Sequence, residues 1–113
     1  MPVGLAEFRR IALALLEVTE GEHDGLPTFL VRGKRFATLG WPDANAASVA
    51  VPEEIREALT AAIPGLFAPM PGKWGDRGHT YLRLDLADAD AVATALRAAW
   101  RRAAPKRLAA TRG

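Results

Sequence analysis

The order of hydrophobic and polar positions predicts three helices along this chain. In each of three segments the apolar residues recur every three or four positions, the spacing that puts them on one side of a helix. The second segment begins at Pro52, a residue favoured in the first turn, and two glutamates follow it. An aspartate precedes the third segment and can cap its first turn. We expect these helices over residues 5–17, over residues 52–63, and from Asp88 or Asp90 to Pro105.

Two β-branched and aromatic runs, residues 28–32 and 35–39, flank Gly33-Lys34 and predict a β-hairpin. A glycine in the first position of a two-residue connection favours a type II′ turn, in which that glycine has a positive φ. This register would place Arg32 opposite Arg35, where like charges repel. A nearby acid or an anionic ligand would relieve that repulsion.

The other segments complete a sheet. Residues 48–51 form a short, mostly apolar run and residues 79–86 alternate apolar and polar side chains, and both patterns are typical of strands. Prolines interrupt residues 66–71, which predicts an edge strand or ordered coil. Residues 19–25 are polar, end in glycine and read as a loop. Helices at the beginning, middle and end of a strand meander predict an α+β fold, an antiparallel sheet packed by helices on one face. The expected core is Phe8, Leu15, Phe29, Phe36, Leu59, Leu82, Leu84 and Leu96.

Three glycines lie at a spacing of three residues in the segment Gly72 to Thr80. Loops that cradle nucleotide phosphates pass from a strand through glycines into a helix, because the helix N-terminus supplies the anion site. Here the glycines lead into a strand. The segment therefore predicts a tight loop and not a nucleotide-binding fingerprint.

Composition narrows the class of protein. The chain has 113 residues, 50% of them hydrophobic and 25% charged, which predicts a single globular domain over residues 1–105 and a frayed basic tail over 106–113. With no cysteine, disulfides, thiol nucleophiles and thiolate-bound metals are excluded. No apolar run is long enough for a membrane span, and the N-terminus does not resemble a signal peptide. We expect a cytoplasmic protein.

Charge is unevenly distributed along the chain. The formal net charge is +2, yet residues 97–113 contain six lysines and arginines and no acid. This asymmetry favours an anionic partner, above all nucleic acid, although cations at a helix C-terminus also complement the helix dipole. Three basic segments could reach phosphates: the hairpin tip, the glycine loop and the end of the last helix. The expected nucleic-acid contacts are Lys34, Arg35, Lys73, Trp74, Arg77, Arg101, Arg102 and Lys106.

Other chemistry has little support in the sequence. Glu22, His23 and Asp24 are adjacent and cannot all point inward, and the second histidine, His79, is far along the chain, so we expect no metal site. The single serine, Ser48, lies in a predicted strand and has no His-Asp partner at a suggestive spacing. No cofactor motif is present. We therefore expect no enzymatic activity.

Several motifs together resemble the MmcQ/YjbR family. They are Phe8-Arg9-Arg10-Ile11-Ala12-Leu13, Glu20-Gly21-x-His23, the hairpin segment from Pro27 to Leu39 with Gly33-Lys34-x-Phe36-Ala37, the loop Trp74-Gly75-x-x-Gly78-x-Thr80, and Ala98-Ala99-Trp100. They occur in the family's order over about residues 5–107. The hairpin and the Trp-Gly loop are the most specific pieces.

The resemblance implies a small bacterial cytoplasmic protein with a CyaY-like α+β fold and the label of a DNA-binding protein, without a known reaction. One position departs from the family, which often has a lysine in a Val-Lys-Leu setting where this chain has Val49-Ala50-Val51. We expect a non-enzymatic DNA-binding protein whose contacts are backbone-driven and weakly sequence-specific. The alternative is a module that binds a protein or a small ligand on the exposed sheet face or in a cleft near Trp74.

Overall fold

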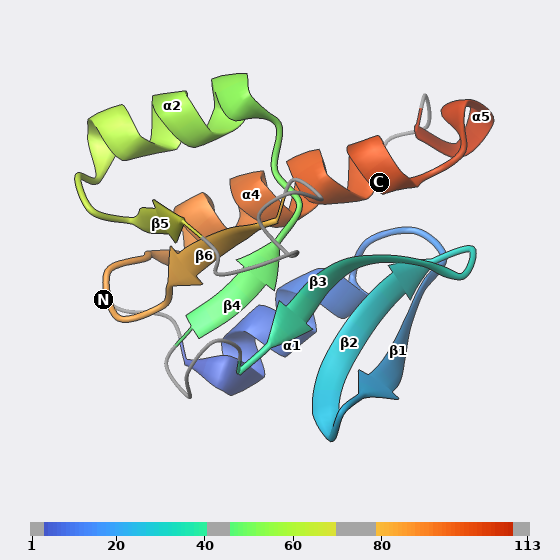
Figure 1. The fold of residues 1–113 in the computed structure, drawn as a ribbon. Coiled ribbons are helices and arrows are strands. Elements are labelled where there is room, and N and C mark those ends of the chain that lie inside the picture. Colours follow the sequence, from blue (N-terminus) through green and yellow to red (C-terminus); the bar gives the residue numbers. More distant parts are fainter. Residues whose placement is uncertain (1–3, 41–45, 70–78, 110–113) are drawn as a thin grey trace.

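The computed structural model describes residues 4–40, 46–69 and 79–109, which form one six-stranded sheet and four helices (Figure 1). The strand order is β1-β2-β3-β4-β6-β5, and every neighbouring pair is antiparallel. This arrangement confirms the predicted α+β class. The strands are β1 (Val18–His23), β2 (Leu26–Val31), β3 (Lys34–Leu39), β4 (Ala46–Val49), β5 (Phe67–Pro69) and β6 (Thr80–Arg83); the helices are α1 (Leu5–Leu13), α2 (Glu53–Ala62), α4 (Ala89–Ala103) and α5 (Lys106–Ala109).

The core lies between one face of the sheet and the helices α1 and α4. The rings of Phe8 and Phe29 pack with their centroids 5.9 Å apart, which joins α1 to β2. Trp100 in α4 is fully buried and its indole Nε1 donates to the Leu16 carbonyl at 2.9 Å. Of the eight predicted core residues, all but Leu59 are buried in this one cluster. Leu59 is only partly buried, because α2 lies at the margin of the core and has no buried residue.

Residues 18–23 form strand β1, so the prediction of a loop over 19–25 is wrong. This edge strand pairs only with β2, and several of its side chains face solvent, which explains its polar sequence. The turn that follows is Asp24-Gly25, with φ of 52° and 79°. Two positive φ values match a type I′ hairpin turn, for which Asp-Gly is a favoured pair. The Asp-Gly dipeptide was therefore the available signal for this hairpin.

The second hairpin exists as predicted, but it turns one residue earlier. The two central residues are Arg32 and Gly33, with φ of 51° and 81°, which is type I′ geometry and not type II′. The positive φ of Gly33 is confirmed. Arg32 does not pair with Arg35: Val31 lies opposite Lys34 and Leu30 opposite Arg35. Because Arg32 stands in the turn, the expected repulsion between two opposed arginines does not occur.

A β-bulge in β3 then changes which residues face the core. Leu30 is opposite Arg35, whereas Phe29 is opposite Ala37, so Phe36 is the additional residue. In a regular strand neighbouring side chains point to opposite faces. The bulge instead lets Phe36 and Ala37 both be buried, while Arg35 is only half-buried. Bulges also bend the strand that contains them.

The remaining differences are at the ends of elements. Helix α1 ends at Leu13, before Glu17 turns the chain into β1 with a φ of 56°. Strand β6 ends at Arg83, and Leu86, expected on its apolar face, is 42% exposed.

The C-terminal region agrees with the sequence in its cap and differs in its tail. The carboxylate of Asp88 caps α4 by accepting from the Ala91 N–H at 2.8 Å, as predicted. In the expected frayed tail, residues 106–109 form the short helix α5 and Leu108 is buried. None of the helices in the described ranges has the length and apolar character needed to cross a membrane.

Candidate anion-binding site

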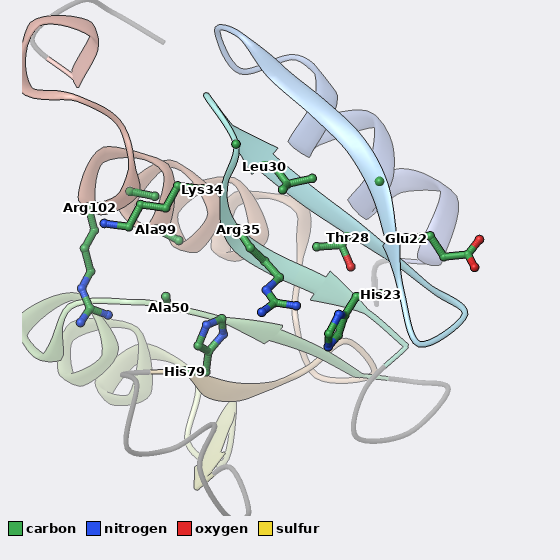
Figure 2. Close-up of a pocket in the computed structure, with 13 residues that line it drawn as sticks. Glu22, His23, Thr28, Leu30, Lys34, Arg35, Ala50, His79, Ala99 and Arg102 are labelled. Carbon is green, nitrogen blue, oxygen red and sulfur yellow. The ribbon is translucent and has the colours of Figure 1, made fainter.

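A hollow of about 690 Å³, which we call the basic hollow, is lined by residues of β1, β2, β3 and α4 together with Ala50 and His79 (Figure 2). It lies where β3 and β4 separate: the two strands pair only from Ala37 and Val49 onward, and the Ala50 N–H bonds to the Phe36 carbonyl at 3.2 Å beside this point. Two residues of α4, Ala99 and Ala103, line its back through that opening.

Four hydroxyl side chains cross the sheet beside the hollow in one row. The registers place Thr28 opposite Thr38, Thr38 opposite Ser48 and Ser48 opposite Tyr81, so all four lie on the same face. The Thr28 hydroxyl donates to the Leu26 carbonyl at 3.2 Å. The buried Thr38 hydroxyl has no hydrogen-bond partner among the described residues. The row makes this face of the sheet polar, although Thr28, Thr38 and Ser48 are buried.

Two histidines belong to the same hollow. His23 ends β1 and His79 directly precedes β6, and both imidazoles line the cavity. The Nδ1 atom of His79 is 2.9 Å from the hydroxyl oxygen of Ser48, a fully buried residue of β4. Figure 2 shows the side chains of His23, Arg35 and His79 directed into the hollow. These two histidines, far apart in the sequence, line one cavity although β2, β3 and β4 lie between their strands in the sheet.

Three cations line the hollow from two directions. Lys34 and Arg35 follow the β2–β3 turn, and Arg102 is in the last turn of α4. Among the described residues, neither Lys34 nor Arg102 has an ion-pair partner. Among the described residues, Glu22 is the one carboxylate that lines the hollow, and Figure 2 shows it directed away from the other charged groups. The hollow therefore carries an excess of positive charge.

The other arginine of this hairpin, Arg32, is engaged elsewhere. The Arg32 guanidinium donates to both carboxylate oxygens of Glu17, at 2.6 and 3.0 Å. These hydrogen bonds, together with the charge of Arg32, hold the pKa of the Glu17 carboxyl below its usual value. Because Arg32 is not among the lining residues, it adds no charge to the basic hollow.

The structure brings together three of the eight predicted nucleic-acid contacts, Lys34, Arg35 and Arg102. Arg101 lines a separate groove between α2 and α4, which Arg102 also borders, and Lys106 is exposed on α5. Lys73, Trp74 and Arg77 lie outside the described residues. The site prediction missed His23 and His79 as partners in one cavity.

No group of three histidine, cysteine, aspartate or glutamate side chains in the described ranges could hold a metal ion. The described part of the hollow offers cationic nitrogens and imidazoles. Groups of this kind donate hydrogen bonds to anions, most of all to phosphate and carboxylate oxygens.

The fold and the hollow together define a class of protein: an α+β protein with one antiparallel sheet, helices over one face and a basic hollow where two of its strands separate. In a comparison with family models, the model described as YjbR matches residues 13–102, well over half of the chain. The chain therefore belongs to the YjbR family, which confirms the resemblance of its motifs. Comparisons with curated proteins and with solved structures gave no match.

Proposed function

We propose that this protein is a non-enzymatic DNA-binding protein that contacts the phosphate backbone with little sequence preference. The observation that carries the proposal is the convergence of Lys34, Arg35 and Arg102 on one hollow from opposite ends of the chain. Phosphate oxygens are the main target of lysine and arginine in protein–DNA complexes.

The pattern of cations favours backbone contacts over base readout. Sequence-specific proteins usually place several polar side chains of one helix or ribbon into the major groove. Here the cations come from a hairpin turn and from the end of a helix, and they surround a hollow. Such an arrangement can hold phosphates at separate points but presents no continuous reading surface.

The position at which this chain departs from its family, Ala50, lies in the same hollow. The family often has a lysine at this position, and Ala50 lines the basic hollow. A lysine there would add a fourth cation beside Lys34, Arg35 and Arg102. This chain is accordingly expected to bind DNA more weakly than a relative that has the lysine, and Ala50→Lys is expected to strengthen binding.

The test is a fluorescence anisotropy titration of a short duplex over a range of salt concentrations. Each neutralised phosphate contributes about 0.9 to the fall of log affinity with log salt, so three contacts predict a slope of about 2.7. Arg102→Ala and Lys34→Ala are each expected to weaken binding to unrelated sequences equally and to reduce the slope by about 0.9.

Arg101→Ala is the matched control, because it removes the same charge from the neighbouring position but lines the other groove. If Arg101 also contacts phosphate, as the sequence predicts, its variant will lower the slope like that of Arg102. Absence of binding by the wild-type protein at low salt, where the electrostatic contribution is largest, would reject the proposal.

A further inference from the structure

We propose that the basic hollow binds a phosphate monoester, the group carried by mononucleotides and other small organic phosphates. This inference goes beyond DNA binding, because it concerns a ligand that enters the hollow and not a duplex that lies across it. It rests on the size of the hollow, its charge, the placement of its donors and its apolar back wall.

The hollow has the size of a small-ligand site. Its volume of about 690 Å³ is within the range of roughly 300–1,000 Å³ found for such sites. A DNA duplex is convex and about as wide as a small domain, so only its outer phosphates could reach the rim. A mononucleotide or a sugar phosphate could be enclosed.

The charge of the hollow matches a dianion. Among the described residues, three cations and one carboxylate line it, an excess of two positive formal charges before the histidines are counted. A phosphate monoester carries about −1.5 to −2 at neutral pH, whereas each diester of a DNA backbone carries about −1. A monoester therefore neutralises the hollow more completely than one backbone phosphate does.

The donors lie on more than one side of the cavity. Lys34 approaches from the hairpin and Arg102 from α4, and the ammonium and guanidinium groups suit the oxygens of a phosphate. Ser48 is fully buried and its bond to His79 holds that imidazole in one orientation at the wall. Side chains fixed before binding lose less conformational entropy when a ligand arrives.

The back wall suits the organic part of such a ligand. Leu30, Ala50, Ala99 and Ala103 are the apolar residues that line the hollow, and three of these four are alanines. Small side chains leave room and contribute no competing polar groups. The combination of a cationic rim and an apolar back is typical of sites that orient a ligand by one charged end.

The test is isothermal titration of the full chain with adenosine 5′-monophosphate and, separately, with adenosine. We expect binding of the monophosphate with a Kd below about 1 mM and no measurable binding of adenosine. A terminal phosphate of a nucleic-acid strand has the same chemistry, so a short 5′-phosphorylated single strand and its 5′-hydroxyl twin are titrated as well. Preference for the phosphorylated strand over the mononucleotide would assign the site to strand ends.

Arg102→Ala and Lys34→Ala are each expected to weaken binding of the monophosphate by about tenfold or more, the loss typical of a hydrogen bond to a charged group. Arg101→Ala, which keeps the hollow intact, is expected to change it less than about twofold. Both Lys34 and Arg102 are exposed, so their variants should fold, and thermal unfolding curves check this.

Three results would overturn the inference: equal affinity for adenosine and its monophosphate, equal losses for Arg101→Ala and Arg102→Ala, or no monophosphate binding. In each case the duplex titration remains an independent measurement. If the protein binds a duplex without 5′-phosphates but not the monophosphate, this inference fails and the proposed function stands. If it binds only the monophosphate, the proposed function fails and the inference stands.

Discussion

In the described part of the chain, three residues other than glycine have left-handed backbone conformations, and two of them are hydrogen-bonded to each other through their side chains. Glu17 and Arg32, with φ of 56° and 51°, flank the strand pair Val18–Val31 and form an ion pair. Such conformations cost free energy in residues with a side chain. Glu17 and Arg32 lie at the open end of the first hairpin, where β1 begins and β2 ends. Their side-chain hydrogen bonds link these two points of the chain. Asp24, the third, is in a turn type that favours aspartate.

Thr38 makes a residue-scale prediction possible, because its buried hydroxyl lacks a partner in the described part of the chain. Thr38→Val keeps the shape and removes the unsatisfied group, so we expect the free energy of unfolding to rise by about 1 kcal/mol. Thr28→Val is the matched control, since it removes the bond to the Leu26 carbonyl and should lower stability by about 1 kcal/mol. Urea unfolding measures both. Destabilisation of equal size in the two variants would contradict the assignment.

At the scale of elements, the hairpins determine which residues reach the site. The Arg32-Gly33 turn puts Lys34 at the start of β3 opposite Val31, and Arg35 opposite Leu30, ahead of the bulge at Phe36. A type II′ turn at Gly33-Lys34 would instead have placed Lys34 inside the turn. One residue of shift changes the face of every following side chain in a strand. The turn therefore decides where Lys34 and Arg35 enter the hollow.

Gly33 tests the turn. Its φ is 81°, and a Cβ at this position would meet no atom within 4 Å, so any cost of a side chain comes from the backbone. Gly33→Ala is expected to lower the free energy of unfolding by about 1–2 kcal/mol. Gly33→Asn should retain more stability, because asparagine tolerates left-handed conformations better. Equal losses in chemical denaturation would show that the turn geometry is not the cause.

At the scale of the whole molecule, one core joins the sheet to α1 and α4, and Phe36 is fully buried in it. Phe36→Ala should lower the free energy of unfolding by about 3–5 kcal/mol through lost apolar burial and a cavity. Leu30→Ala, on the opposite face and only half-buried, should cost clearly less. The two variants are compared by the denaturant concentrations at their unfolding midpoints, with equal dependence of the free energy of unfolding on denaturant. A smaller loss for Phe36→Ala than for Leu30→Ala would place the core on the wrong face.

Much of this architecture could be predicted from local patterns. The three long helices follow from apolar spacing, the Asp88 cap from a residue type at a helix start, and the second hairpin from two apolar runs around a glycine. These features depend on residues a few positions apart, and local sequence specifies them through propensity and periodicity. Strand β1 was not predicted, because an edge strand with exposed polar side chains has the composition of a loop.

By itself, the sequence determined the α+β class, the family and the cationic residue types available for binding. Only the tertiary structure decided that Lys34 and Arg102 share a hollow, that His23 and His79 line it, and that Arg101 faces another groove. The physical reason is distance along the chain. A site assembled from a hairpin, two strand ends and a helix end depends on strand order, a bulge and helix packing. Those are set by the burial of the whole core, which no local pattern records.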